Sequence, residues 1–448
     1  MRLRGERMNT FDLAYAAGAV LLSPIWARKM RHGWGERFGR VPALPAKAPG
    51  RARVLLHAVS VGEVSALREL VPMLSRAPRG AVGEGRVGGE PPEIVIAAGT
   101  DTGLRRAGEL FGAQPGVVGI VRYPLDFSGA VERFLDAVRP DLVALVELEV
   151  WPNFVSACVR RGIPVGVING RLSERSFGGY QRIRRIIGPS FSRLAFAAVQ
   201  DEVYAQRFAA MGVAPERLTV TDSMKWDAAR IEDGVPDSPT RLGSEGLAGV
   251  LMIDRARPLV VAGSTGPGEE ALLHAACPEG VQLLCAPRKP ERAEDAARAL
   301  PGATIRRGRQ VGDRYDTLTT YVKGTDRFLL ATIGELRAAY ALADVVVLGR
   351  SFFRLHGSDP VEPIGLGKAT MIGPRFGDFE SATRALWEAG GLQISDADRL
   401  GADLKRLLGD AGAREEMARR GRECIRARQG ASARHAELLC AHLASLSR

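Results

Sequence analysis

The amino-acid sequence predicts an α/β protein of two domains, built on parallel sheets with helices on both faces. The chain has 448 residues, which is too many for one hydrophobic core and suits two α/β domains of roughly 200 residues each. Short apolar runs alternate with amphipathic stretches along most of the chain, and this alternation is typical of parallel sheets. Ligands of such folds bind at the carboxyl ends of strands, so we expect the functional residues there.

The strand candidates are short apolar runs, and helical stretches lie between them. The strands are predicted at Val54–His57, Ile94–Ala97, Leu142–Val146, Pro164–Ile168, Leu194–Val199, Leu259–Ala262, Val281–Cys285, Val345–Leu348 and Thr370–Ile372. Helices are predicted at Val64–Leu74, Gly129–Val138, Glu202–Met211, Glu269–Ala276 and, over the last stretch, Arg414–Leu446.

Two stretches break this pattern. Residues 76–92 are rich in Gly, Pro and charge and are predicted to form a flexible surface insertion. Residues 228–257 are polar and turn-prone and are predicted to link the domains. We therefore expect an N-terminal segment at 1–40, a first domain at 41–227, the linker, and a second domain at 258–448 that includes the C-terminal helices.

The composition indicates a globular protein in a reducing compartment. Hydrophobic residues make up 46% of the chain and charged residues 25%, which argues against disorder. The five cysteines form no CxxC pair and the six histidines show no HxxH or HExxH spacing. We therefore expect no disulfide framework, no metal site and no cofactor.

The positive charge is concentrated near the N-terminus. The net charge is +11, and residues 1–56 hold eleven Lys or Arg against three acidic residues. They bracket an apolar stretch, Phe11 to Trp26, interrupted by Asp12. It is shorter than the ~20 residues that span a bilayer, and no small-residue cleavage site follows it. We predict a helix that lies on or dips into an anionic membrane surface; the alternative is a buried first helix. We see no nucleic-acid-binding motif.

The segment HAVSVGEV at 57–64 follows a predicted strand and opens a helix. Ser60 and Gly62 permit a tight turn, and Glu63 falls in the first helical turn. A helix N-terminus stabilises a carboxylate by about 0.3–1 kcal/mol, so Glu63 could be a simple helix-start acid. The functional alternative is a general base.

Two further segments of the first half end strands with polar residues. In ELEVWPN at 147–153, Glu147 and Glu149 should share one face of the strand, because side chains alternate, and Trp151 and Pro152 suit the start of a helix. NGRLSERSFGGY at 169–180 opens a basic stretch, which is either a solvated face or a site for phosphate or anionic lipid. Its arginines are Arg171, Arg175, Arg182, Arg184, Arg185 and Arg193.

The second half has its own strand-end segments. AGSTGPGEE at 262–270 has small residues that let backbone N–H groups approach an anion, but it lacks the Walker A and GxGxxG spacings. APRKPER at 286–292 presents Arg288, and TIGELRAAYALADVVVLGRSF spans 332–352. DPVEP at 359–363 places Glu362 early in a helix, where it could accept hydrogen bonds from a ribose.

The order and spacing of these segments resemble the Kdo (3-deoxy-D-manno-octulosonic acid) transferases of lipopolysaccharide synthesis over nearly the whole chain. The pattern of that family reads approximately HAVSVGEV, ETELWPN, NARLSERS, TGNLKFD, STHEGEE, PRHPER, GELxxxYxxADVAFVGGS and GGHNPLEP. The first and third motifs are close to intact here. The N-terminal segment is also similar, since it ends in a GxRFG-like run at Glu36–Gly39.

The resemblance implies a GT-B fold, in which two Rossmann-like domains face each other across a cleft. The first domain would bind a lipid A precursor and the second CMP-Kdo. The implied reaction is an inverting, metal-independent transfer at the cytoplasmic face of the inner membrane. Glu63 would be the catalytic base, supported by Glu147 or Glu149. Donor-binding residues would be Ser264, Arg288 at the CMP phosphate, the Ile333–Gly334 backbone near the cytosine, Glu362 at the ribose, Asp359 and Lys225; Arg171 and Arg175 would meet the acceptor.

Departures from the family pattern lie mainly on the donor side. TGNLKFD reads TDSMKWD at 221–227, STHEGEE reads STGPGEE, PRHPER has Lys289 for His, and VGGS reads LGRS at 348–351. GGHNPLEP reads HGSDPVEP, so Asp359 replaces an Asn; a carboxylate there repels an anion unless Lys225, Lys289 or Arg350 compensates. Two alternatives therefore stay open: a GT-B transferase that uses another nucleotide sugar, and a non-catalytic membrane-bound relative.

Overall fold

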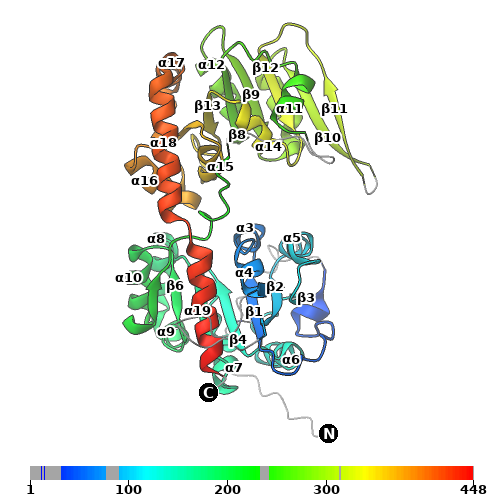
Figure 1. Ribbon diagram of the computed structural model, residues 1–448, viewed down its shortest axis with the longest axis vertical. Helices are drawn as coiled ribbons and strands as arrows, with labels where there is room; N and C mark the ends of the chain where they lie inside the picture. Colours follow the sequence, from blue (N-terminus) through cyan, green and yellow to red (C-terminus); the bar gives the residue numbers. More distant parts are fainter. Residues whose placement is uncertain are drawn as a thin grey trace. The chain divides into compact units, whose positions relative to one another are not determined.

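The computed structural model describes Asp12, Tyr15 and residues 32–76, 90–232, 242–311 and 314–446. The chain divides into two compact units (Figure 1). Unit 1 comprises Met1–Ala228 and Gln429–Arg448, and unit 2 comprises Ala229–Arg428. Each unit is built on one sheet with helices around it, so the predicted pair of parallel α/β sheets is confirmed.

Unit 1 contains a seven-stranded sheet in the order β3-β2-β1-β4-β5-β6-β7, and every neighbouring pair is parallel. The strand order reverses between β1 and β4, and ligands of such sheets bind at the carboxyl ends of the strands beside this reversal. The strands are β1 (Arg53–Ala58), β2 (Glu93–Ala98), β3 (Val117–Arg122), β4 (Leu142–Val146), β5 (Val165–Gly170), β6 (Ala197–Val199) and β7 (Leu218–Val220).

Helices cover both faces of this sheet, and an apolar core fills each side. The strand residues of β1, β2, β4 and β5 are buried throughout, as expected for parallel strands covered on both faces. The helices before the C-terminal one are α2 (Trp34–Arg37), α3 (Val61–Ala66), α4 (Leu70–Arg76), α5 (Asp101–Phe111), α6 (Ser128–Val138), α7 (Pro152–Arg160), α8 (Glu174–Arg182), α9 (Arg184–Phe191), α10 (Glu202–Met211) and the 3₁₀ turn η1 (Pro215–Arg217).

The last helix, α19 (Ala431–Ser445), packs on unit 1 (red in Figure 1), although the sequence placed it in the second domain. Leu439 and Leu443 are buried in the core between β1 and α4, and burying such side chains stabilises a fold by about 1.5–3 kcal/mol each. Asp227 caps the helix by accepting hydrogen bonds from the N–H groups of Gly430 and Ser432. These contacts are long-range, so helical periodicity alone could not assign the helix to a unit.

Unit 2 contains an eight-stranded sheet in the order β11-β10-β12-β9-β8-β13-β14-β15. Only the β10–β11 pair at one edge is antiparallel, and the order reverses between β8 and β13. The strands are β8 (Leu259–Thr265), β9 (Gln282–Pro287), β10 (Thr304–Val311), β11 (Arg314–Thr320), β12 (Arg327–Ala331), β13 (Val345–Leu348), β14 (Ala369–Ile372) and β15 (Gln393–Ile394). The helices are α11 (Ser244–Leu251), α12 (Glu269–Ala276), η2 (Pro290–Arg292), α13 (Ala293–Ala299), α14 (Leu336–Leu342), α15 (Val361–Gly365), η3 (Gly377–Phe379), α16 (Glu380–Glu388), α17 (Leu400–Gly409) and α18 (Ala411–Arg428).

All nine predicted strands are present, with shifted ends at several of them. The sequence missed β3, β7, β10, β11, β12 and β15. Both β10 and β11 are rich in Arg, Thr and other polar residues; β11 forms the edge of the sheet and β10 lies next to it, so neither strand has the apolar run by which the others were predicted. The predicted helix Val64–Leu74 is two helices, α3 and α4, and the predicted helix Arg414–Leu446 is broken at Gly430, whose φ of 96° is left-handed.

Several predictions concern residues that the structure describes only in part. The insertion at 76–92 lies mostly outside the described residues, and so does 1–31 except Asp12 and Tyr15. In the predicted linker 228–257, residues 228–232 and 242–257 are described, and Ser244–Leu251 forms α11 as part of unit 2. Among the described residues, no helix is long and apolar enough to cross a membrane.

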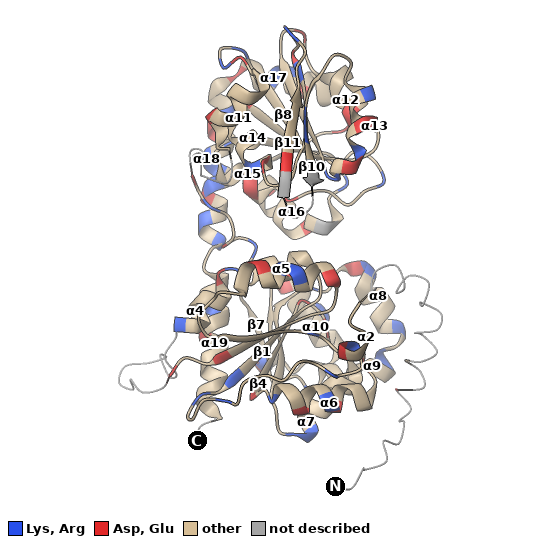
Figure 2. Ribbon diagram, turned by 90° about the vertical axis from the view of Figure 1, so that its right-hand side faces the viewer, with Lys and Arg blue, Asp and Glu red and all other residues tan. Residues whose placement is uncertain are grey.

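Asp12 is buried in unit 1 at the start of α6, which explains an acidic residue within an apolar stretch. Its carboxylate accepts hydrogen bonds from Ser128 N and Oγ at 2.7 and 2.6 Å, and from Asn153 Nδ2 at 3.1 Å. The ring of Tyr15 packs edge-on against Phe127 and Trp151. Figure 2 shows that most charged residues of both units lie on helices and loops, while the strands are mostly uncharged.

Candidate active site

The carboxyl edge of the unit 1 sheet, at the reversal between β1 and β4, brings together His57, Glu63, Glu147 and Glu149. His57 lies near the end of β1, Glu63 lies in the first turn of α3, and the other two glutamates follow β4. The charges of Glu147 and Glu149 both act on Glu63. The structure therefore gathers the three predicted catalytic residues at the place where the topology favours a ligand.

Glu63 makes the contacts of a helix-capping residue. Ser60 is the N-cap of α3, and its hydroxyl donates to Glu63 Oε1 at 2.8 Å, while Val59 N–H donates to Glu63 Oε2 at 2.7 Å. This is close to a capping box, in which the N-cap residue and the third helical residue bond each other. The local sequence, Ser60 with Glu63 three residues later, therefore determines where this carboxylate lies.

Capping does not account for the acidity of Glu63. Burial and, to a smaller extent, the charges of Glu147 and Glu149 raise its pKa, the hydrogen bonds from Val59 and Ser60 partly oppose this, and the resulting pKa is about 7. A carboxyl group with a pKa near 7 can exchange a proton at physiological pH, as a general base must. The structure thus shows the capping contacts of Glu63, and since a capping residue can also act as a base, the general-base role stays a prediction.

Glu147 and Glu149 lie in the turn after β4, and the strand-alternation argument for them was wrong. β4 ends at Val146, and Glu147 has a left-handed φ of 65°, which ends the strand. Trp151 Nε1 donates to Glu149 Oε2 at 2.7 Å. Burial raises the pKa of Glu149, and the charge of Glu147 adds to the increase.

Lys225 lies in unit 1, with its Nζ 3.9 Å from Glu147 Oε1. The resemblance had implied a donor-binding role for Lys225, whereas in the structure its ammonium group lies beside the carboxylate of Glu147. The neighbouring residues of TDSMKWD also bind unit 1: Met224 N–H donates to Asn169 Oδ1 at 3.0 Å, and Asp227 caps α19. The segment 221–227 therefore connects the turn that holds Glu147 to α19.

His57 is a site residue that the sequence analysis did not single out. Its Nδ1 lies 3.1 Å from the carbonyl oxygen of Ala97, so Nδ1 holds the proton and Nε2 is an acceptor. Nε2 has no hydrogen-bond partner among the described residues and lies 3.9 Å from Glu149 Oε2. Burial lowers the pKa of His57 to about 3, so the ring is neutral. Its place near the end of β1, at the head of HAVSVGEV, was the available signal.

Arg171 and Arg175 follow β5 at the same edge of the sheet. The N–H of Arg171 donates to the carbonyl oxygen of Glu147 at 3.3 Å, which ties the two loops together. Arg175 is exposed in α8. Beyond it, α8 and α9 expose Ile183 and Ile186 among further arginines, so this face is both basic and apolar.

In unit 2, the loop after β8 is held by the protein's own carboxylate. Glu269 accepts hydrogen bonds from the N–H groups of Gly266, Arg350, Ser351 and Phe352 at 2.6 to 3.1 Å. These backbone donors are therefore occupied, and the expectation that the N–H groups of this loop approach an external anion does not hold for Gly266. Ser264 lies near the end of β8 with a left-handed φ of 56°.

Arg288, Asp359 and Glu362 lie close enough to one residue to act on it together. Tyr340 is buried, and burial raises its pKa well above the usual value; the charges of Glu362 and Asp359 add to this and Arg288 opposes it. Arg288 is exposed at the end of β9. Glu362 Oε1 lies 3.9 Å from Arg337 Nη1. The structure thus groups three of the predicted donor-side residues.

Asp359 and the Ile333–Gly334 loop have clear local roles. Asp359 Oδ1 accepts a hydrogen bond from Val361 N at 3.0 Å, at the start of α15. Ile333 is exposed, and Gly334 has a φ of 89°. The loop is held by Glu335, whose carboxylate is bound at both oxygens by Arg306 at 2.9 and 2.8 Å. Among the described residues, no group of three or more His, Cys, Asp or Glu side chains is arranged to hold a metal ion.

Comparison with known sequences identifies relatives over more than nine tenths of the chain. The family described as 3-deoxy-D-manno-octulosonic-acid transferase (kdotransferase) matches residues 32–228. The 3-deoxy-D-manno-octulosonic acid transferase of Bordetella pertussis is 30% identical, over 93% of this chain and 94% of the relative. The enzyme of the same name from Haemophilus influenzae is 28% identical, over 94% of each chain.

Comparison with solved structures supports the fold. Anabaena Alr3699/HepE, solved in complex with UDP, has a TM-score of 0.56 and 12% sequence identity, over 87% of this chain and all of that one. UDP-GlcNAc 2-epimerase from Neisseria meningitidis, solved with UDP-GlcNAc, has a TM-score of 0.54 at 12% identity, over 86% of this chain and 99% of that one. These likenesses show the type of fold, two Rossmann-like units as in GT-B proteins.

Proposed function

Because the chain belongs to the family of 3-deoxy-D-manno-octulosonic acid (Kdo) transferases, we propose that it transfers Kdo from CMP-Kdo to a lipid A precursor in lipopolysaccharide biosynthesis. Family membership makes the chain a glycosyltransferase. The finer parts of the proposal are the donor, the acceptor, an inverting and metal-independent course, and the residues that act.

The observation that carries the proposal is the state of Glu63. Its pKa is raised to about 7 by burial and by the charge of Glu147, and it lies beside the strand-order reversal of unit 1. Groups with such a pKa are effective general bases near neutral pH. No Arg or Lys is paired with the Glu63 carboxylate among the described ion pairs, so its basicity is not reduced by a cation in direct contact.

In the proposed reaction, Glu63 accepts the proton of an acceptor hydroxyl as that oxygen attacks the anomeric carbon of Kdo. The new carbon–oxygen bond forms while the bond from the anomeric carbon to the CMP phosphate oxygen breaks. CMP leaves with the bonding electron pair, and the proton stays on Glu63. One displacement of this kind inverts the configuration at the anomeric carbon.

Unit 2 supplies the proposed donor groups. Arg288 is exposed at the end of β9 and would bind the CMP phosphate, since guanidinium geometry matches phosphate oxygens. Glu362 would bind the ribose, and the Ile333–Gly334 backbone would lie by the cytosine, with Ser264 and Asp359 near the sugar. The charges of Arg288, Asp359 and Glu362 all act on Tyr340, which supports a shared site.

The proposed acceptor is anionic and lipid-linked, which suits the basic face of unit 1. Arg171 and Arg175 would contact its anionic groups. The excess of Lys and Arg in residues 1–56 would favour an anionic membrane, and we propose peripheral or N-terminal attachment at the cytoplasmic face of the inner membrane. Deleting residues 1–30 should then move the protein from the membrane fraction towards the soluble one.

A second candidate keeps the fold but changes the donor. One observation favours it: Asp359 stands where the family motif GGHNPLEP has an Asn. A CMP-linked acidic sugar brings a phosphate and a carboxylate to that place, and a third negative charge opposes binding. A donor without a sugar carboxylate would avoid this repulsion.

The test is product analysis with CMP-Kdo and a tetra-acylated lipid A precursor, for the wild type and Glu63→Gln in parallel. Formation of Kdo-lipid and CMP by the wild type alone supports the donor, the acceptor and the base together. CMP release from other CMP- or UDP-sugars but not from CMP-Kdo supports the second candidate. No turnover with any donor, in protein that binds CMP, indicates a non-catalytic relative.

A further inference from the structure

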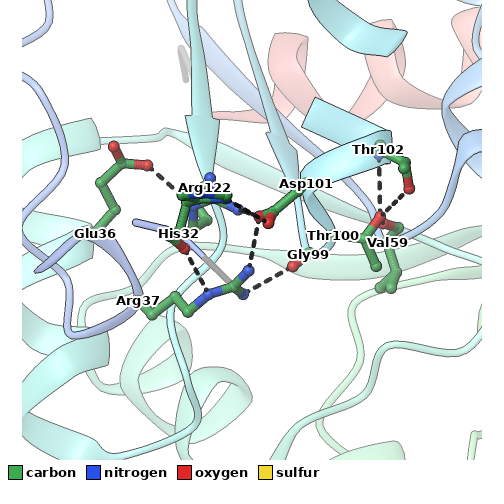
Figure 3. Close-up of polar contacts among 10 residues, drawn as sticks. His32, Glu36, Arg37, Val59, Gly99, Thr100, Asp101, Thr102 and Arg122 are labelled. Carbon is green, nitrogen blue, oxygen red and sulfur yellow. Dashed lines mark hydrogen bonds and ion pairs between the residues drawn. The ribbon is translucent and has the colours of Figure 1, made fainter. Parts of the chain in front are cut away.

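A cluster of two buried arginines and one aspartate holds the turn between β2 and α5 in unit 1. In this Arg37 cluster, Arg37 is 1% exposed and Arg122 is 5% exposed. Both donate to Oδ1 of Asp101, at 3.2 Å from Arg37 Nη2 and 2.5 Å from Arg122 Nη1 (Figure 3). Burying two guanidinium groups is costly, so a role for the cluster has to be sought in what it holds.

Arg37 binds both sides of Thr100. Its Nη1 donates to the carbonyl oxygen of Gly99 at 2.9 Å, and its Nη2 donates to Asp101. Arg37 is itself held, since its Nε donates to the carbonyl oxygen of His32 at 3.3 Å and its own carbonyl oxygen accepts from Leu125 N–H at 2.8 Å. One side chain thus fixes the residues before and after Thr100.

Thr100 in turn holds one carbonyl group, that of Val59. Its backbone N–H and its hydroxyl both donate to Val59 O, at 3.1 and 2.9 Å (Figure 3). The approach is close: a Cβ on Gly103 would lie 2.8 Å from that oxygen, and a Cβ on Gly99 would lie 3.1 Å from Val59 Cγ1. The turn and Val59 can therefore move only together.

Val59 is one of the two residues, with Ser60, that donate a hydrogen bond to the Glu63 carboxylate. Its N–H donates to Glu63 Oε2 at 2.7 Å, while its carbonyl oxygen is the one held by Thr100. The charged groups that act on Glu63 from other elements are Glu147 and Glu149, and Lys225 lies beside Glu147. The Arg37 cluster does not contact Glu63 itself; it is linked to Glu63 through Thr100 and Val59.

We propose that Arg37 is a positioning residue for Glu63, acting through the Gly99–Asp101 turn and Val59. The proposal rests on the proposed function, in which Glu63 is the base. A carboxylate that takes a proton during bond formation must keep a narrow geometry, and a displacement of about 1 Å can cost about 100-fold in rate. The segment that follows the basic N-terminus thereby becomes part of the catalytic scaffold of unit 1.

The test compares Arg37→Gln and Thr100→Val with the wild type, using CMP-Kdo and the lipid acceptor over a range of pH. Glutamine cannot bind both Gly99 and Asp101, and valine keeps the shape of threonine without its hydroxyl. We expect kcat to fall about tenfold or more with little change in KM. The acid limb of the kcat profile should move to higher pH, because a carboxylate with a weakened N–H donor ionises less readily.

Matched variants separate positioning from general stability. Arg133 also binds the segment of Arg37, donating from Nε to the carbonyl oxygen of Phe38 at 3.0 Å, but it is not bonded to the 99–101 turn. Arg133→Gln should keep the wild-type kcat and acid limb. The double variant of Arg37→Gln and Thr100→Val should lose less than the product of the two single effects, since both act on Val59.

Two results overturn the proposal. The first is that Arg37→Gln lowers the Tm while the acid limb of its kcat profile, and that of Thr100→Val, stay as in the wild type. Arg37 would then be structural only. The other is full multiplicativity of the two single effects. Glu63→Gln in the same assay isolates the premise: if that variant turns over normally, the base assignment fails, whatever the arginine variants do.

Discussion

Glu63 of unit 1 and Glu269 of unit 2 occupy corresponding places. Each lies in the first turn of the helix that follows a strand at the reversal of its sheet, α3 after β1 and α12 after β8. Glu63 accepts from one N–H and one hydroxyl, and its pKa is about 7. Glu269 accepts from four backbone N–H groups.

The difference lies in the number of donors around each carboxylate. The carboxylate of Glu269 accepts hydrogen bonds from four N–H groups and so holds the loops after β8 and β13 in place, which makes Glu269 a structural residue. Glu63 has two donors and is buried beside two acidic neighbours, so burial and their charges raise its pKa. The same element of fold thus holds a fixed contact in one unit and the proposed base in the other.

The largest expected effect is at Glu63. Glu63→Gln keeps the shape of the side chain and removes the base, so kcat should fall by about 10²–10⁴-fold while CMP-Kdo affinity, measured by titration, stays the same. In the wild type, kcat should rise with pH through about 7 as Glu63 loses its proton. Near-normal kcat in the variant would place the base elsewhere, with Glu149 next to test.

The same residue should affect stability with a definite sign. The folded pKa of Glu63, about 7, lies above its usual value of 4.5, so the folded state binds this proton more tightly than the unfolded state. Its stabilising contribution is complete below about pH 4.5 and is lost as the pH rises through 7, by up to about 3 kcal/mol. The difference in unfolding free energy between wild type and Glu63→Gln should follow that curve in urea titrations from pH 4 to 8.

Glu269→Gln should destabilise unit 2 by about 3 kcal/mol, because an amide oxygen cannot accept from four N–H groups and its NH₂ faces donors. Chemical denaturation measures the loss. Glu388→Gln is the control, since Glu388 is exposed on α16 of the same unit. Equal stability of the two variants would mean that the hydrogen bonds of Glu269 are not what holds these loops.

Glu147→Gln should shift the pH dependence without removing the base. Loss of the Glu147 charge takes away a cause of the raised pKa of Glu63, so the acid limb of kcat should move to lower pH by roughly half to one unit. Glu216→Gln, at an exposed position of unit 1, controls for the change in net charge. An unmoved limb would show that Glu147 does not act on the catalytic proton.

The smallest effect is expected at Asp359. Its hydrogen bond from Val361 N–H can be kept by an amide oxygen, so Asp359→Asn should leave α15 intact while removing a negative charge. CMP-Kdo should bind as tightly as in the wild type or up to about fivefold tighter. Much weaker binding of the variant in a titration would mean that the carboxylate makes a required contact.

The sequence was sufficient for properties that depend on local pattern. Apolar runs identified nine strands, including β4 and β13 to the residue, because buried parallel strands need continuous apolar side chains. The segment HAVSVGEV predicted that Glu63 lies in the first turn of a helix, and α3 confirms this. The ordered motifs identified the family, since each follows a strand and their order along the chain is preserved.

Only the tertiary structure decided which distant residues meet. It placed α19 on unit 1, with His435 Nε2 accepting from Asn169 N–H at 2.8 Å across 266 positions of the chain, and it placed Lys225 beside Glu147. It also decided the surroundings of each glutamate, because Glu63 and Glu269 look alike in sequence and differ in the neighbouring charges and hydrogen-bond donors. Periodicity reports which side of an element is buried, whereas the charges and donors around a buried group come from other elements of the fold.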